Sequence, residues 1–238
     1  MYEYERNQAY TADAGSLNAY MTKVFLNMAV GLGLTALVAF LGYYSVMTGG
    51  IFYTILVSMP MLGIILLLAQ LGIAIALGHG ITKYSAGTCR GLFLGYSAMT
   101  GITFTTLALS YGIGTVFTAF LFAAVLFACC AVIGKYTNVD LSRFSGLFRG
   151  ALIALLITTV ISLFVPALRA SLFMSYAGLL IFLGLTAYDM QKITHFYYSS
   201  GGTLRENLAI YAAFELYLDF INILIYLVRI LGSRNSRR

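Results

Sequence analysis

The chain has 238 residues, of which 61% are hydrophobic and only 9% are charged, whereas about a quarter of the residues in a soluble domain are charged. This composition excludes an ordinary soluble protein and indicates an integral membrane protein. The formal net charge of +6 does not indicate nucleic-acid binding, because the basic residues are scattered over short loops, and attraction to anionic membrane lipid explains it more simply.

Seven apolar runs of about twenty residues follow one another along the chain, separated by short polar joints. Each run is expected to form a transmembrane α-helix, because backbone N–H and C=O groups need internal partners in hydrocarbon. The continuity of the runs excludes a β-barrel, whose strands are shorter and alternate in polarity. In chain order the runs are 24–46, 51–77, 87–109, 113–134, 147–165, 170–188 and 208–231.

The predicted fold is therefore an all-α, seven-transmembrane helix bundle over residues 24–231. A polar N-terminal tail (1–23) precedes it and a basic C-terminal tail (232–238) follows it. The opening residues lack the features of a secretory signal peptide, so the first helix is expected to serve as its own insertion signal.

The distribution of basic residues predicts the orientation. One side of the membrane collects the N-terminal tail and the joints after the second, fourth and sixth runs, and this side is expected to be cytoplasmic. The other side collects Arg169 and the C-terminal arginines. Seven spans would place the C-terminal arginines outside the cell, and their positive charge argues against that. Six spans with one re-entrant segment would instead return these arginines to the cytoplasm, where they would bind anionic lipid. The basic residues on the first side are Arg6, Lys23, Lys83, Arg90, Lys135, Arg143, Arg149, Lys192 and Arg205; the C-terminal arginines are Arg229, Arg234, Arg237 and Arg238.

Cysteine and histidine give no sign of a resident metal, cofactor or enzymatic activity. Cys89, Cys129 and Cys130 are too few for a disulfide framework, and His79 and His195 have no metal-ligand spacing around them. All five are predicted to be dispensable.

Two glycine pairs have the spacing that allows transmembrane helices to approach closely. They lie in GLFLG at 91–95 and GLFRG at 146–150. Ordinary glycine usage in membrane helices explains them equally well.

Three carboxylates lie within the apolar runs, where an ionised side chain costs about 2.5–3.5 kcal/mol and so suggests a function. Glu215, Asp219 and Asn222 share one face of the seventh helix, since they are four and three residues apart. Asp189 is expected to close the sixth helix in TAYDMQKI, near a boundary marked by Lys192. A carboxylate pair across these two helices is feasible, and Glu215 is expected to lie nearer than Asp219 to Asp189 in depth.

Three longer stretches, KYTNVDLSRFSG, AYDMQKI and LYLDFINIL, together with the seven-span layout resemble the Bax inhibitor family, the transmembrane Bax inhibitor motif proteins, in its bacterial form. The resemblance covers essentially the whole chain and implies a central seventh helix, a calcium-leak activity and location in the bacterial inner membrane. It implies a pH-sensing pair formed by Asp189 and Asp219. It also implies a cation that latches onto the sixth-helix aspartate, for which Lys83, or otherwise Arg90, is the expected counterpart. Glu215 is not part of the family pattern, so whether it joins the sensor stays open.

The resulting hypothesis is a pH-sensitive calcium leak, with calcium as the transported ion. Coupled carboxylates hold one proton to a higher pH, and Asp189, Glu215, Asp219 and Asn222 offer the oxygen ligands that Ca²⁺ prefers. A proton-coupled transporter and a membrane modulator of stress response or proteolysis are the alternatives. An aspartyl protease is disfavoured, because neither YDM nor LDF has a glycine beside the aspartate. A membrane-protein partner and a homodimer both stay compatible with the sequence.

Overall fold

The computed structural model describes residues 2–59, 61–80, 83–165, 171–199 and 206–235, and this part of the chain is helical without strands. Seven helical segments are long and apolar enough to cross a membrane, which confirms the predicted fold class. Of the basic residues used to predict the orientation, Arg169, Arg205, Arg237 and Arg238 lie outside the described residues. The elements are α1 (Tyr2–Met47), α2 (Ile51–Ser58), α3 (Leu62–Gly80), α4 (Ala86–Tyr111), α5 (Ile113–Tyr136), the 3₁₀ helix η1 (Leu141–Phe144), α6 (Ser145–Phe164), α8 (Leu172–Ser199) and α9 (Glu206–Asn235).

Several of the predicted segments differ in extent, and α9 continues to Asn235, into the segment interpreted as the C-terminal tail. The second run forms two helices, α2 and α3, because α2 stops at Ser58 and Met59 has an extended φ of −121°, as expected of a residue that precedes proline. The sixth helix continues to Ser199, so the prediction that Asp189 closes it was wrong. α1 begins at Tyr2, within the segment interpreted as a polar tail.

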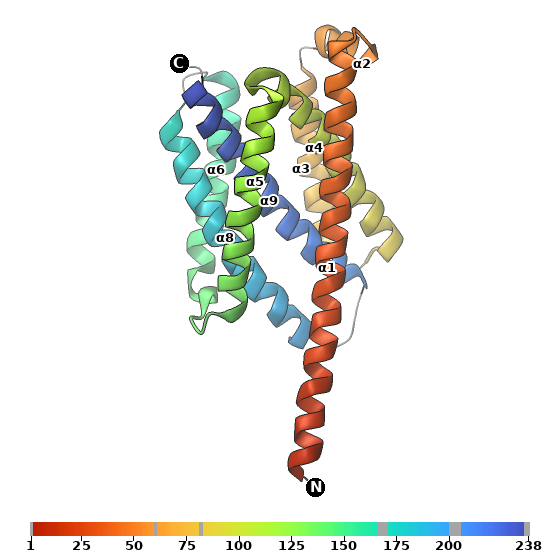
Figure 1. Ribbon diagram of the computed structural model, residues 1–238, viewed down its shortest axis with the longest axis vertical. Helices are drawn as coiled ribbons and strands as arrows, with labels where there is room; N and C mark the ends of the chain where they lie inside the picture. The colour runs from red at the N-terminus through yellow and green to blue at the C-terminus, as the bar shows by residue number, and fades with distance from the viewer. Residues whose placement is uncertain (1, 60, 81–82, 166–170, 200–205, 236–238) are drawn as a thin grey trace. The chain divides into compact units, whose positions relative to one another are not determined.

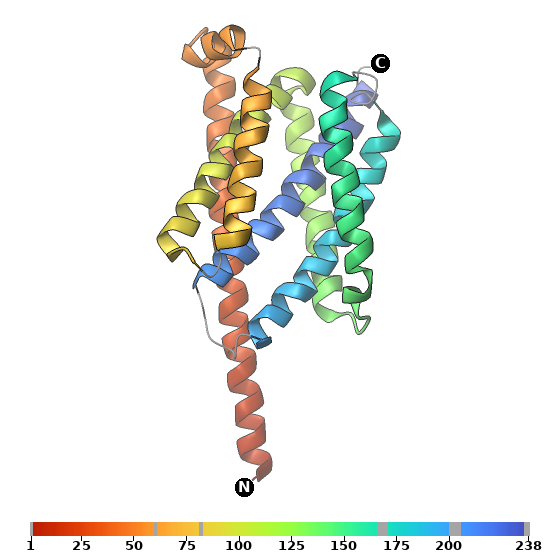
Figure 2. The ribbon, with the colours of Figure 1, turned by 180° about the vertical axis from the view of Figure 1, so that it is seen from behind.

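The chain forms two compact units. Unit 1 comprises Met1–Leu109 and Phe196–Tyr217, and unit 2 comprises Ser110–His195 and Leu218–Arg238. Unit 1 therefore contains α1 to α4, the end of α8 and the first part of α9. Unit 2 contains α5, η1, α6, most of α8 and the rest of α9. Figure 1 and Figure 2 show these elements from opposite sides.

The core of unit 1 forms where the first part of α9 meets α4. Phe214 and Tyr217 meet Phe93 and Tyr96 edge to face, with ring centroids 5.0–6.0 Å apart, a favourable arrangement for aromatic rings. The Tyr217 hydroxyl lies 2.7 Å from the Thr35 hydroxyl of α1. Because Thr35 is also buried, this bond satisfies two polar groups that would otherwise be costly in an apolar interior.

The core of unit 2 also contains edge-to-face contacts between aromatic rings of α9 and a neighbouring helix. Phe220 of α9 packs edge to face against Phe120 and Phe127 of α5, with centroids 5.5 Å and 5.7 Å apart. Gly134 of α5 faces the backbone of α8, and a Cβ at this position would overlap the carbonyl oxygen of Ala187. Close approach of these two helices therefore requires glycine at position 134.

The glycine pairs singled out by their spacing do not have this role within the described part of the chain. A Cβ built on Gly91, Gly95, Gly146 or Gly150 meets no described atom within 4 Å. Of the two explanations left open by the sequence, ordinary glycine usage therefore fits these positions within the described residues, because spacing alone does not show which face of a helix meets a neighbour.

α9 is the most buried of the seven candidate spans. In its most apolar window 67% of the residues are buried, against 6–39% in the other six. This is the burial expected of a central seventh helix. α3 and α6 show the opposite pattern, with 6% buried, as expected of helices that face lipid.

Candidate functional site

Asp219 is the most deeply buried carboxylate for which burial is described. It lies in the part of α9 that belongs to unit 2, and only 3% of the residue is exposed. The next residue, Phe220, is locked between two rings of α5, which fixes the rotation of α9 and keeps Asp219 inside the unit. On α5, Cys130 lies within electrostatic range of Asp219.

Asp189 lies on α8 of the same unit, with 14% of its side chain exposed. The Lys192 ammonium, three residues later on the same helix, approaches Asp189 Oδ1 to 3.8 Å. Residues three apart on a helix are neighbours, so this cation belongs to the local environment of Asp189. The sequence alone assigns Lys192 to the membrane boundary and does not show this ion pair.

Asn222 follows Asp219 by one helical turn. Its Nδ2 donates to the Leu218 carbonyl at 2.7 Å, which leaves the amide oxygen as an acceptor. Of the four predicted ligands, Asp189, Asp219 and Asn222 belong to unit 2, whereas Glu215 belongs to unit 1.

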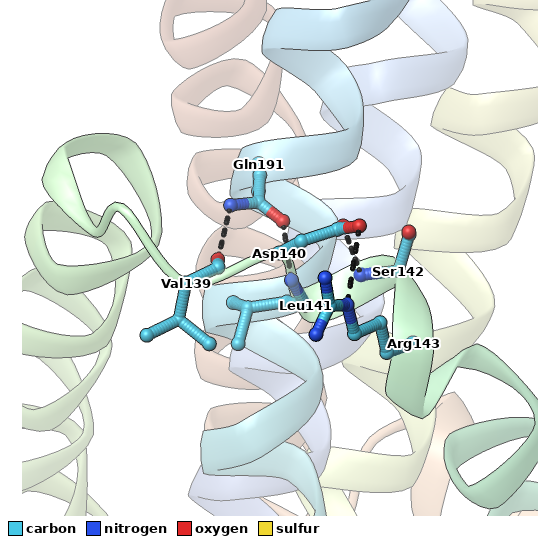
Figure 3. Close-up of polar contacts among 6 residues, drawn as sticks. All are labelled: Val139, Asp140, Leu141, Ser142, Arg143 and Gln191. Carbon is cyan, nitrogen blue, oxygen red and sulfur yellow. Dashed lines mark hydrogen bonds and ion pairs between the residues drawn. The ribbon is translucent and has the colours of Figure 1, made fainter.

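The two family-like stretches KYTNVDLSRFSG and AYDMQKI are joined through one side chain, Gln191 (Figure 3). Its Nε2 donates to the Val139 carbonyl at 2.9 Å, and its Oε1 accepts from the Leu141 N–H at 2.9 Å. The amide thus holds the loop between α5 and η1 against α8, two residues beyond Asp189. Sequence reasoning missed this contact, because both partners of the side chain are backbone groups some 50 residues away.

The same loop carries Asp140, whose carboxylate caps η1. Asp140 Oδ1 accepts from the Ser142 N–H at 3.0 Å, and Arg143 Nε lies 3.8 Å from Oδ2. The hydrogen bonds from Ser142, with a smaller contribution from Arg143, hold the pKa of Asp140 below its usual value.

The remaining predicted site residues belong to unit 1. Arg90 of α4 pairs with Glu206 at the start of α9, and both side chains are half exposed. Asn207 also binds this region, since its Nδ2 donates to the Tyr84 carbonyl at 2.7 Å. Lys83 is exposed in the turn before α4, and no carboxylate among the described residues forms an ion pair with it.

Glu215 lies in the part of α9 that belongs to unit 1 and is partly buried. Tyr20 of α1, which is fully buried, lies within electrostatic range of it.

Within the described residues, no group of three or more His, Cys, Asp or Glu side chains is placed to hold a metal ion. Cys89 is buried, Cys130 is intermediate and Cys129 is exposed. The dispensability of the cysteines and histidines stays a prediction.

Comparison with known proteins matches residues 17–236 to the family model described as "Inhibitor of apoptosis-promoting Bax1". The inner membrane protein YbhL of Escherichia coli is 33% identical over 237 residues, which cover 98% of this chain and all of YbhL. A protein of Rickettsia prowazekii is 35% identical over 227 residues, covering 95% of this chain and 94% of its own length. A membrane protein of Streptococcus pyogenes is 34% identical over 226 residues, covering 95% and 97%.

Proposed function

Because this chain belongs to the Bax inhibitor family of membrane proteins, we propose that it is a pH-sensitive calcium leak in which Asp189 and Asp219 line the ion route. The observation that carries the proposal is the burial of Asp219, 3% exposed on an apolar helix. An ionisable residue held at such a position is costly and indicates a function. The choice of calcium as the ion, and the pairing of Asp219 with Asp189, come from the resemblance of LYLDFINIL to the family motif.

The unit 2 side chains fit calcium in transit. Ca²⁺ takes six to eight oxygen ligands, and Asp189, Asp219 and the amide oxygen of Asn222 offer part of that number, with water completing it. Conduction requires binding that is weak enough to release the ion, and an incomplete protein ligand set provides this. Calcium here is cargo, and we propose neither a resident cofactor nor an enzymatic reaction.

Protonation of Asp189 and Asp219 is proposed to control the leak, because it changes the negative charge along the ion route. Among the described residues, Lys192 lies beside Asp189 on α8, and Cys130 of α5 lies within electrostatic range of Asp219. The Lys192 ammonium, 3.8 Å from Asp189 Oδ1, competes with Ca²⁺ for that carboxylate. Removing charge from either aspartate weakens the attraction for a divalent cation.

The identity of the latch cation is a separate part of the proposal. The resemblance implies Lys83 or Arg90, yet in the structure Arg90 pairs with Glu206 and Lys192 lies beside Asp189. If Lys83 is the latch, Lys83→Ala alters the pH response more than Lys192→Ala does.

Calcium flux in proteoliposomes that contain only the purified chain, measured from pH 5 to 8, tests the function. We expect passive, non-saturating flux whose pH response is flattened by Asp189→Asn and by Asp219→Asn. Glu215→Gln shifts the midpoint to lower pH if Glu215 belongs to the cluster, because one repulsion between carboxylates is removed. Asp140→Asn, at an exposed carboxylate, is the matched control and should keep the response of the unmodified protein.

Other outcomes assign the protein to another class. Saturable flux coupled to protons would indicate a transporter, and no flux at any pH would favour a modulator of stress response or proteolysis. A full pH response that survives in the double Asp189→Asn, Asp219→Asn variant would refute the sensor.

The orientation is also proposed, with the N-terminus in the cytoplasm and the protein in the bacterial inner membrane. Reporter fusions after residues 48, 111 and 169 should report outside, and those after 84, 138 and 200 inside. A C-terminal fusion that reports inside would contradict seven spans.

A further inference from the structure

A cleft in unit 2 lies where three helix ends meet: the end of α6, the start of α8 and the end of α9. Its polar lining residues are Thr158, Thr159 and Ser162 on α6 and Tyr226 and Arg229 on α9. The volume of its interior is about 30 Å³, which is more than one ordered water needs. The interior can therefore hold the oxygen atoms of a ligand, while the rest of that ligand stays outside the cleft.

Arg229 has a positive charge available for a ligand. Its guanidinium lies over the ring of Tyr226, 5.8 Å from the centroid, and no carboxylate among the described residues pairs with it. Tyr226 is 8% exposed, and a Cβ at Gly178 of α8 would overlap its ring. Gly178 therefore makes room for the ring that supports the guanidinium, and the planar fork of arginine suits oxyanions, above all phosphate.

The three hydroxyls can supply further donors at small cost. Each now donates within α6: Thr158 to Ala154, Thr159 to Leu155 and Ser162 to Thr159, at 2.7–2.8 Å. In a helix interior these carbonyl oxygens also accept a backbone bond. A threonine hydroxyl of this cleft that rotates toward a ligand therefore leaves the Ala154 or Leu155 carbonyl with its backbone donor.

The position of the cleft indicates which anion it meets. Arg229 lies six residues before the end of α9, about 9 Å along the helix, so the cleft lies near the boundary of the membrane-spanning segments. Beside it on α6, Ile157, Val160 and Ile161 are 42–54% exposed and offer an apolar surface to acyl chains. A cation above an aromatic ring, next to a lipid-facing helix, is typical of headgroup contacts at the membrane interface.

We propose that this cleft binds the phosphate group of an anionic phospholipid, with Arg229 as the charged ligand and the α6 hydroxyls as donors. A phosphate without a neighbouring ammonium, as in phosphatidylglycerol, is held more strongly than the zwitterionic headgroup of phosphatidylcholine. Binding stabilises unit 2 by joining the ends of α6 and α9, and this site is independent of the proposed ion route.

The test compares lipid binding by the full chain, purified in detergent and depleted of lipid. Phosphatidylglycerol, phosphatidylcholine or inorganic phosphate is added, and the thermal unfolding midpoint and the lipid retained in native mass spectrometry are measured. We expect phosphatidylglycerol to raise the midpoint more than the other two, and Arg229→Gln to weaken its binding about tenfold or more. Arg149→Gln, at an exposed arginine near the opposite end of α6, is the matched control and should bind as the unmodified protein does.

A second variant covers the case in which Arg229→Gln does not fold. Thr158→Val with Ser162→Ala keeps the shape of the cleft but removes two donors, and it should also lose the preference for phosphatidylglycerol. Equal binding of both lipids by the unmodified protein, or equal loss in Arg149→Gln, would overturn the proposal. Stabilisation by inorganic phosphate as strong as that by the lipid would assign the cleft to a soluble anion and overturn the lipid assignment.

Discussion

Replacing Gln191 with methionine tests whether its amide fastens the loop before η1 to α8. Methionine is similar in length and flexible, but it neither donates to Val139 nor accepts strongly from Leu141. Each of the two bonds, both 2.9 Å, contributes about 0.5–1.5 kcal/mol net. The Val139 residue is 57% exposed, so water can replace the amide there, and most of the loss falls on the partly buried bond to Leu141. We therefore expect the local opening free energy of the loop to fall by about 1 kcal/mol.

The assay is hydrogen exchange at the Leu141 amide in detergent-solubilised protein. A loss of about 1 kcal/mol increases exchange about fivefold. Gln191→Glu serves as the matched variant, because a carboxylate still accepts from the Leu141 N–H but cannot donate to the Val139 carbonyl. Leu141 protection should therefore survive in Gln191→Glu and fall in Gln191→Met. Unchanged protection in Gln191→Met, or equal loss in both variants, would refute the reasoning.

Three further predictions concern other parts of the fold. Thr35→Val removes the buried hydrogen bond to Tyr217 and should lower the free energy of unfolding by about 1–2 kcal/mol. In thermal unfolding, the double variant Thr35→Val, Tyr217→Phe should lose far less stability than the sum of the losses in the two single variants. Gly134→Ala forces a Cβ into the α8 backbone and should cost about 1–3 kcal/mol, whereas Gly146→Ala, in open space, should leave the unfolding midpoint unchanged. Because the pKa of Asp140 is lowered, its ionised carboxylate should protect the Ser142 amide from hydrogen exchange above pH ~4, and this protection should disappear as the pH falls through the lowered pKa. The protection factor of the Ser142 amide between pH 2 and 6 should show the loss, and in Asp140→Asn that factor should no longer depend on pH.

The spans were predictable because hydrocarbon forces a simple relation between sequence and structure. Every backbone polar group needs a partner in its own helix, so an apolar run of twenty residues has few alternatives. The break after Ser58 could also have been predicted, since the sequence places a proline two residues later. The extension of α8 to Ser199 was harder to predict from the sequence, because the polar residues beyond Asp189 end the apolar run without ending the helix.

Contacts between distant segments were not predictable. Gly134 and the glycines of GLFLG look alike in sequence, and only the neighbouring backbone of Ala187 distinguishes them. The resemblance implies Arg90 as the alternative latch cation, but in the structure Arg90 pairs with Glu206. Both facts depend on which helix faces which, and the periodicity of a single run does not contain that information.

The turn of α8 around Asp189 brings three different interactions within four residues. Asp189 supplies a largely buried carboxylate, Gln191 binds the loop backbone, and Lys192 places an ammonium 3.8 Å from the carboxylate. On the proposed function, protonation of Asp189 removes a charge that attracts both calcium and the Lys192 ammonium. Since Gln191 fixes the adjacent loop by uncharged bonds, protonation of Asp189 should leave that loop attached to α8.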